Sequence, residues 1–182
     1  MKFLLVRHCE TDWNKEWRLQ GHTDTNLNEY GWLQAEDLAK KLVGNGLKKI
    51  ISSDLMRSIE TASVIERYLK IPVAYDSRLR ECNFGSLEGK KRDEVLTIYR
   101  PKTIDIEGNW HGSFLDYDFE SFGGESSDKV FRRHLSLLDE LNANISSEPT
   151  LLVGHGTGLN TLLFRLKKQR IERGECVEIE YP

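Results

Sequence analysis

Cysteine is scarce in this sequence, and its placement does not suggest a disulfide framework or a metal site. The chain has 182 residues and only 3 cysteines. These are Cys9, Cys82 and Cys176, an odd set in which no pair shows C-x-x-C spacing. Small disulfide-stapled folds and structural zinc sites need even or closely spaced sets. Both classes are therefore excluded as the organising feature of the chain.

Long apolar runs and an excess of basic charge are also missing. No stretch approaches the roughly 20 apolar residues of a membrane span, and the apolar start of the chain, residues 1–6, is too short for a secretion signal. Basic residues number 26 against 29 acidic ones, which gives a net charge of −3. We therefore expect a cytoplasmic protein that binds neither a membrane nor nucleic acid.

What the sequence does contain is a regular alternation of short apolar runs with helical patterns. The runs predict strands over residues 2–7, 47–52, 72–75, 149–153 and 176–180, and the patterns predict helices over 28–43, 57–69, 91–99, 158–166 and a long stretch opened by 123–127. Such alternation indicates a mostly parallel sheet covered on both faces. We predict a single α/β domain over residues 1–182, with three layers (α/β/α) and one antiparallel edge strand.

Two segments show neither the helical nor the strand period of apolar residues. Residues 8–27 are polar and predict a long loop with one helical turn at most, and loops of this length are more often functional than idle. Residues 100–123 are rich in aromatic side chains. We predict that segment 90–123 caps a binding site, with the alternative that its aromatic side chains only cover the rim of the core.

Charged side chains follow the predicted strands at the points where these strands end. Arg7 and His8 follow the first strand, Arg57 the second, Glu81 the third and His155 the fourth. Any one of them alone would be an ordinary surface or structural residue. Because the carboxyl ends of parallel strands share one edge of a sheet, we predict that the five converge into one pocket.

Two guanidinium groups in one pocket indicate an anionic ligand, and their planar fork fits phosphate. Backbone N–H groups at Gly156 and Thr157, at the start of a helix, would add further donors. A neutral imidazole among such donors can attack phosphorus. A carboxylic acid is then needed to protonate the departing alcohol and to activate water. Glu81 is the only carboxylate that the strand order places at this edge with a turn-rich stretch around it.

At this point the residues resemble those of a known family, the histidine phosphatase superfamily in its phosphoglycerate mutase-like branch. The resemblance covers nearly the whole chain, in blocks that keep the order and spacing of the family. They are LVRHCETDWN followed by LQGHTDTNLNEYGWLQA, then SSDLMRSIETA, LRECNFGSLEG, GGES and LLVGHGTGLN.

The resemblance implies roles for the five residues at the sheet edge. His8 matches the nucleophile that accepts the phosphoryl group, and Glu81 matches the proton donor. Arg7, Arg57 and His155 match the rest of the phosphate pocket. The chemistry that follows is hydrolysis of a small phosphomonoester through a phosphohistidine, with no metal and no cofactor.

The resemblance also implies substrate-binding residues outside the strand ends. Asn14, Gln20 and Gly21 match the loop that lines the same pocket in the family, and Gly156 lies at the start of the helix after His155. The implied partner is a small phosphorylated metabolite. Neither its identity nor the oligomeric state can be read from the sequence, and a homodimer stays open.

The first block departs from the family, because Cys9 stands where Arg-His is usually followed by glycine. The family glycine permits a close backbone approach, so Cys9 must either adopt an ordinary φ or displace a neighbour. One alternative follows: a weakly active protein that only binds a phosphate ligand. A redox switch at Cys9 or Cys82 is the less favoured alternative, since buried thiols are usually inert.

The mutases of the family are a further alternative. They are generally longer and carry Arg-His-Tyr after the acid, whereas Glu81 is here followed by Cys-Asn-Phe-Gly. The basic run 90–92 would suit a second acidic group, although such runs are usually solvated. The sequence therefore favours a phosphatase over a mutase.

Overall fold

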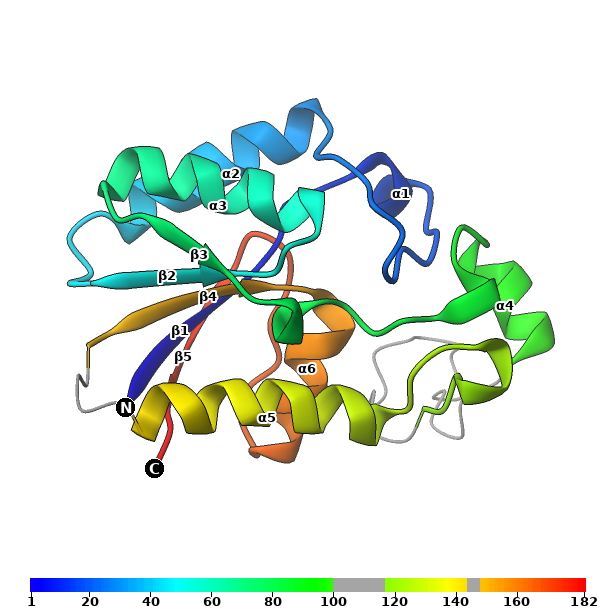
Figure 1. The fold of residues 1–182 in the computed structure, drawn as a ribbon. Helices are drawn as coiled ribbons and strands as arrows, with labels where there is room; N and C mark the ends of the chain where they lie inside the picture. Colours follow the sequence, from blue (N-terminus) through cyan, green and yellow to red (C-terminus); the bar gives the residue numbers. More distant parts are fainter. Residues whose placement is uncertain (100–116, 144–147) are drawn as a thin grey trace.

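The computed structural model describes residues 1–99, 117–143 and 148–182, in which one sheet of 5 strands lies between two layers of helices (Figure 1). The strands are β1 (Lys2–Arg7), β2 (Lys49–Ser52), β3 (Val73–Tyr75), β4 (Thr150–Gly154) and β5 (Cys176–Glu180). Their order is β3-β2-β4-β1-β5, and all neighbours are parallel except β1 and β5. The predicted fold class is confirmed, including the antiparallel edge strand.

The helices alternate with the strands as predicted. They are α1 (Asp12–Lys15), α2 (Glu29–Leu42), α3 (Met56–Leu69), α4 (Arg92–Ile98), α5 (Ser127–Ala143) and α6 (Gly156–Arg165), with short 3₁₀ turns η1 (Ser77–Leu79), η2 (Gly85–Leu87) and η3 (Glu120–Phe122). Helix α6 begins before the predicted residue 158, because His155 is extended and acts as its N-cap. The N–H groups of its first turn therefore point out of the helix toward the sheet edge.

Alternate side chains of the strands build two cores, one on each face of the sheet. Leu4 and Val6 of β1 belong to the core that packs against α2 and α3. Phe3 and Leu5 belong to the core that packs against α5 and α6. The period of two in the strands thus forces helices onto both faces, as Figure 1 shows with α2 and α3 on one side and α5 and α6 on the other.

A third apolar cluster lies beyond the sheet, around η2, η3 and α4. Tyr117 and Phe119 are buried in it, with Phe84 and Val95. The described aromatic side chains of segment 90–123 thus pack into a core. Residues 100–116 lie outside the described residues, so a cap over the site stays a prediction, as does one domain over residues 1–182. In the described part of the chain, no helix is long and apolar enough to span a membrane.

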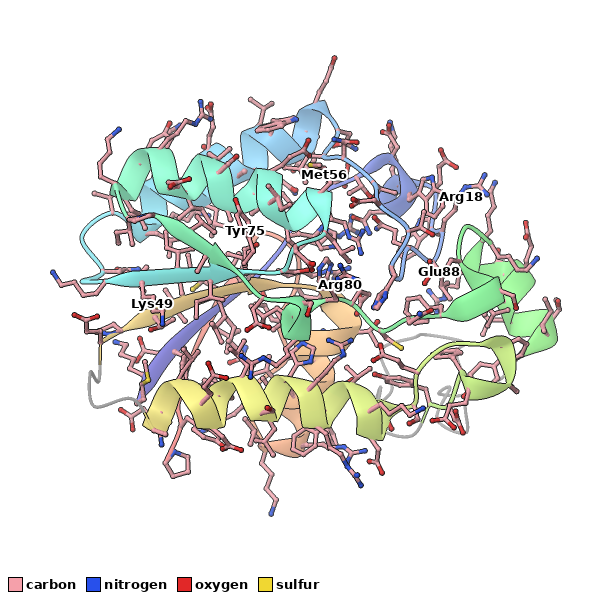
Figure 2. All side chains as sticks on the ribbon, in the orientation of Figure 1. Arg18, Lys49, Met56, Tyr75, Arg80 and Glu88 are labelled. Carbon is pink, nitrogen blue, oxygen red and sulfur yellow. The ribbon has the colours of Figure 1, made fainter. Side chains whose placement is uncertain are left out.

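The carboxyl ends of the parallel strands all face one end of the molecule. Figure 2 shows Arg18, Arg80 and Glu88 toward this end, and Lys49, at the start of β2, at the opposite end. The long loop that follows β1 and the segment that leads to α4 also lie there (Figure 1). The strand order therefore places the predicted site at this end of the molecule.

Candidate active site

A cavity of about 230 Å³ opens at the carboxyl ends of β1 and β4. Among the described residues that line it are Arg7, His8, Arg57, Glu81 and Gly156. This volume is below the range of about 300–1,000 Å³ that is usual for drug-sized ligands. The cavity therefore suits a small metabolite.

His8 is held by its own backbone neighbour. Its Nδ1 lies 2.7 Å from the carbonyl oxygen of Cys9. A carbonyl only accepts hydrogen bonds, so Nδ1 must carry the proton and Nε2 keeps its lone pair. Burial, with the nearby Arg57 and Arg7 charges, holds the pKa of His8 well below its ordinary value. The imidazole is therefore neutral at physiological pH, and Nε2 keeps a lone pair.

The rings of His8 and His155 lie 5.0 Å apart. His155 is fully buried, and its Nδ1 accepts a hydrogen bond from Arg57 Nε at 3.2 Å. Its Nε2 lies 2.8 Å from the hydroxyl of Ser53 and 3.2 Å from that of Ser58. Burial and the Arg57 charge hold the pKa of His155 well below its ordinary value. His155 is thus a neutral hydrogen-bond acceptor that orients Arg57 from outside the cavity.

Arg57 is completely buried at the start of α3 and is gripped by the long loop after β1. Its Nη1 donates to the carbonyl of Thr23 at 3.0 Å, and its Nη2 donates to the carbonyl of Gly21 at 2.7 Å. Burial lowers its pKa to about 10, which still leaves it charged at neutral pH. The guanidinium is a fixed positive charge with N–H groups to spare for an anion.

Arg7 is held differently, against the backbone of α6. A Cβ atom on Gly156 would lie 2.7 Å from the guanidinium carbon of Arg7, so only glycine allows this contact. Arg7 Nε is buried and has no hydrogen-bond partner among the described residues. Burial lowers the pKa of Arg7 to about 10. Arg7 lines the cavity, so its guanidinium charge can act on an anion bound there.

Glu81 is docked on the first turn of α6. Its Oε1 accepts from the backbone N–H groups of Gly158 at 2.8 Å and Cys82 at 2.9 Å. Its Oε2 accepts from the N–H of Thr157 at 3.0 Å. The helix N-terminus therefore positions a carboxylate at the cavity wall.

The loop residues Asn14 and Gln20 line the cavity as well. Thr11 caps α1 and forms a reciprocal capping pair with Asn14. Gln20 Oε1 accepts from the hydroxyls of Thr11 at 3.0 Å and Thr25 at 2.6 Å. With its oxygen engaged in this way, Gln20 can offer its amide N–H groups to a ligand.

The placement differs from the predicted site in three respects. Gly21 and His155 do not line the cavity, because Gly21 contributes its carbonyl and His155 its ring to holding Arg57. The N–H of Thr157, predicted as a phosphate donor, is occupied by Glu81. Of the two predicted backbone donors, the N–H of Gly156 is the one with no partner among the described residues.

Sequence reasoning missed most of the outer wall of the cavity. This wall carries four further arginines, Arg18, Arg92, Arg170 and Arg173. Arg170 lies 3.0 Å from Glu172 and Arg173 lies 3.3 Å from Glu10. Two basic runs in the sequence point to this wall: residues 90–92, which end in Arg92, and residues 167–173, between α6 and β5. Arg18 in turn lies 2.6 Å from Glu16, so carboxylates offset part of the positive charge that these arginines bring to the wall.

Cys9 adopts an ordinary backbone conformation, since positive φ among the described non-glycine residues occurs only at Trp17, Lys70 and Lys167. Its side chain is completely buried in the core under α2 and α3. Burial raises the pKa of the thiol to about 11, so the reactive thiolate is absent at neutral pH. The structure offers no steric reason for a weakened nucleophile, and burial disfavours the redox switch at Cys9.

We therefore expect Cys9→Gly to leave kcat/KM within about twofold while lowering the free energy of unfolding by about 1–3 kcal/mol, from lost core contacts and added backbone entropy. Steady-state kinetics and urea titration measure the two effects. Cys9→Ala is the matched control, because it removes the thiol without adding glycine freedom. A gain in turnover of tenfold or more would instead support the weakly active alternative.

No group of three or more His, Cys, Asp or Glu side chains in the described ranges is arranged to hold a metal ion. The site instead combines a neutral imidazole, two buried guanidinium groups and a carboxylate on an α/β/α fold. Such a site is suited to binding a phosphate group.

The sequence model of the histidine phosphatase superfamily (branch 1) matches residues 3–181, and the chain belongs to this family. A probable phosphoglycerate mutase GpmB of Salmonella paratyphi A is 36% identical over 166 residues, which covers 90% of this chain and 73% of the relative. Its counterpart in Proteus mirabilis is 35% identical over 165 residues, with the same coverage of 90% and 73%.

Solved structures with similar folds include phosphatases. A mycobacterial glucosyl-3-phosphoglycerate phosphatase in complex with VO3 aligns with a TM-score of 0.84 and 28% identity, over 98% of this chain and 92% of that one. A mutant phosphoserine phosphatase from Entamoeba histolytica in complex with phosphoserine aligns with a TM-score of 0.77 and 26% identity, over 97% and 89%. The family thus includes relatives named as mutases and as phosphatases.

Proposed function

We propose that this protein hydrolyses a small phosphomonoester through a phosphohistidine at Nε2 of His8, without a metal ion. The observation that carries the proposal is the hydrogen bond from His8 Nδ1 to the carbonyl of Cys9 at 2.7 Å. It fixes the tautomer in which Nε2 holds a lone pair, in a cavity that two arginines make positive.

In the first step Nε2 attacks phosphorus, and the bond from phosphorus to the ester oxygen breaks. Arg7 and Arg57 stabilise the charge on the equatorial oxygens. Glu81 donates a proton to the leaving oxygen. Its Oε1 already accepts two N–H groups and its Oε2 only one. Oε2 therefore has the free lone pair that can carry this proton.

In the second step water attacks the phosphohistidine, and the bond from Nε2 to phosphorus breaks with its electron pair returning to the ring. Glu81, now ionised, accepts the proton of the water molecule. The cycle ends with free phosphate, a neutral His8 and a protonated Glu81. His155 acts in both steps through Arg57, which it holds at 3.2 Å.

Trapping of the intermediate tests the proposal. Protein mixed with a radiolabelled phosphomonoester and quenched in base should carry label that mild acid releases, and peptide mapping should place it on His8. Label on another residue, or turnover with no trapped label under single-turnover conditions, would contradict the proposal. A panel of phosphorylated metabolites then identifies the substrate by kcat/KM.

A mutase is the second candidate, favoured by the arginines of the outer wall and by relatives named as probable phosphoglycerate mutases. Arg170 and Arg173 lie where a second anionic group of a substrate or activator would be neutralised. Assays with phosphoglycerate isomers, with and without a bisphosphate activator, separate the two functions. Interconversion that depends on the activator and exceeds phosphate release would favour the mutase.

A further inference from the structure

The guanidinium of Arg133, on α5, binds the segment that carries Glu81 at three separate carbonyl groups. Its Nη1 donates to the carbonyl of Arg78 at 2.8 Å and to that of Arg80 at 2.6 Å. Its Nη2 donates to the carbonyl of Glu81 itself at 2.7 Å. One rigid side chain thus fixes the backbone on both sides of the acid's attachment point.

Arg133 is itself fixed by Glu125, which belongs to the GGES block just before α5. Arg133 Nε lies 3.1 Å from Glu125 Oε1, and Nη2 lies 3.1 Å from Oε2, so the pair is bidentate. Both side chains are largely buried. Although burial raises the pKa of Glu125, the hydrogen bonds and charge of Arg133 hold it below its ordinary value. The pair is therefore ionised at neutral pH.

Glu125 also grips the segment beyond Glu81. Its Oε2 accepts from the N–H of Asn83 at 2.9 Å, and its own backbone N–H donates to the carbonyl of Asn83 at 2.8 Å. The carbonyl of Glu81 receives a second bond, from Nε2 of His22 at 3.0 Å. The segment from residue 78 to residue 83 is therefore clamped on its α5 side, while the carboxylate is docked on α6.

We propose that Arg133, held by Glu125, is a positioning residue for the acid–base step, because it sets where the Glu81 carboxyl stands relative to the leaving oxygen. The inference rests on the proposed function, in which Glu81 protonates that oxygen. Neither Arg133 nor Glu125 lines the cavity. A displacement of about 1 Å of a catalytic group can cost about 100-fold in rate, so the clamp matters without touching substrate.

The dependence of the hydrolysis rate on the leaving group distinguishes this positioning role from a merely structural one. An alkoxide is a poor leaving group and needs the proton of Glu81, whereas p-nitrophenolate departs readily without it. The ratio of kcat/KM for β-glycerophosphate to that for p-nitrophenyl phosphate therefore reports on the acid. Because both values come from one preparation, the ratio does not change if part of a variant fails to fold.

We expect Arg133→Met to lower this ratio about 100-fold, with the value for p-nitrophenyl phosphate falling less than about fivefold. Glu125→Gln should lower it in the same direction by a smaller factor, because it keeps the shape but removes the charge that orients Arg133. Glu81→Gln removes the acid itself, so its ratio gives the largest decrease that the loss of the proton donor can cause. Arg132→Met is the matched control, since Arg132 is the exposed neighbour on the same helix, and its ratio should be unchanged.

An equal loss for both substrates in Arg133→Met would overturn the inference, because it would show a general effect on the fold or on phosphate binding. So would an unchanged ratio. A wrong role for Arg133 can be told apart from a wrong proposed function by trapping label on His8 of the unaltered protein. If label is trapped and the ratio does not fall, only the role of Arg133 is rejected. If no label is trapped, the proposed function and this inference both fall.

Discussion

Replacement of His8 by asparagine is expected to lower kcat by at least about 10⁴-fold and to abolish trapped label, because the chain loses its nucleophilic nitrogen. The side-chain amide of asparagine can reproduce the Nδ1–H bond to the Cys9 carbonyl, which is 2.7 Å long in the native site. It has no counterpart of Nε2. The substitution therefore removes the nucleophile while keeping the local hydrogen bond.

Rapid-quench kinetics with a phosphomonoester measures both the turnover and the label. Urea unfolding of His8→Asn is the control for the fold, since a chain that unfolds at nearly the native urea concentration has lost chemistry rather than structure. A variant that keeps a tenth or more of the native kcat would contradict the assignment of His8. It would then leave His155 as the other histidine of the site, despite its burial behind Arg57.

The second large effect is expected on stability in mild acid. His8, His134 and His155 are all buried, and burial lowers the pKa of each, that of His134 to about 3. In the unfolded chain their pKa values return to about 6.5. Unfolding below pH 6.5 therefore takes up protons, so the stability that is present above pH 6.5 is lost as the pH falls.

The size of this effect follows from the number of histidines. Each one adds up to about 1.4 kcal/mol per pH unit to the slope of the unfolding free energy, so three approach roughly 4 kcal/mol per pH unit between about pH 5 and 6. The contribution of His134 to the loss of unfolding free energy continues down to its folded pKa of about 3. Urea titrations at half-unit steps from pH 7 to pH 5 measure the slope.

His134 allows a clean comparison because it has no part in the proposed chemistry. Its Nδ1 bonds the carbonyl of Val130 at 2.9 Å, and its Nε2 is buried without a partner among the described residues. His134→Leu should lower the slope by about 1.4 kcal/mol per pH unit. Leu138→Ala, a buried change on the same helix, should lower stability at every pH but leave the slope unchanged. Equal slopes for His134→Leu and the native chain would contradict the assigned cause.

The order and type of the elements could be predicted from the sequence, because strand and helix periods are local properties of the chain. The apolar runs at 2–7 and 149–153 and the helical spacing between them are enough for a parallel sheet with helices on both faces. The convergence of Arg7, His8, Arg57 and Glu81 followed from topology alone, since these residues come after strands of one sheet.

Only the tertiary structure decided what each of these side chains does. Arg57 and His155 are 98 positions apart, and their contact depends on how α3 packs beside β4. The same holds for Arg133, whose long side chain reaches carbonyl groups 52 to 55 positions away.

The amino-acid sequence by itself determined the sheet, its helices and the set of groups that meet at its edge. The tertiary structure decided the tautomer of His8 and the hydrogen bonds that hold Glu81 on α6. It also decided which arginines line the outer wall of the cavity. The physical reason is that periodicity encodes which face a residue presents, whereas a hydrogen bond needs two atoms within about 3 Å. That distance is set by the packing of the whole chain.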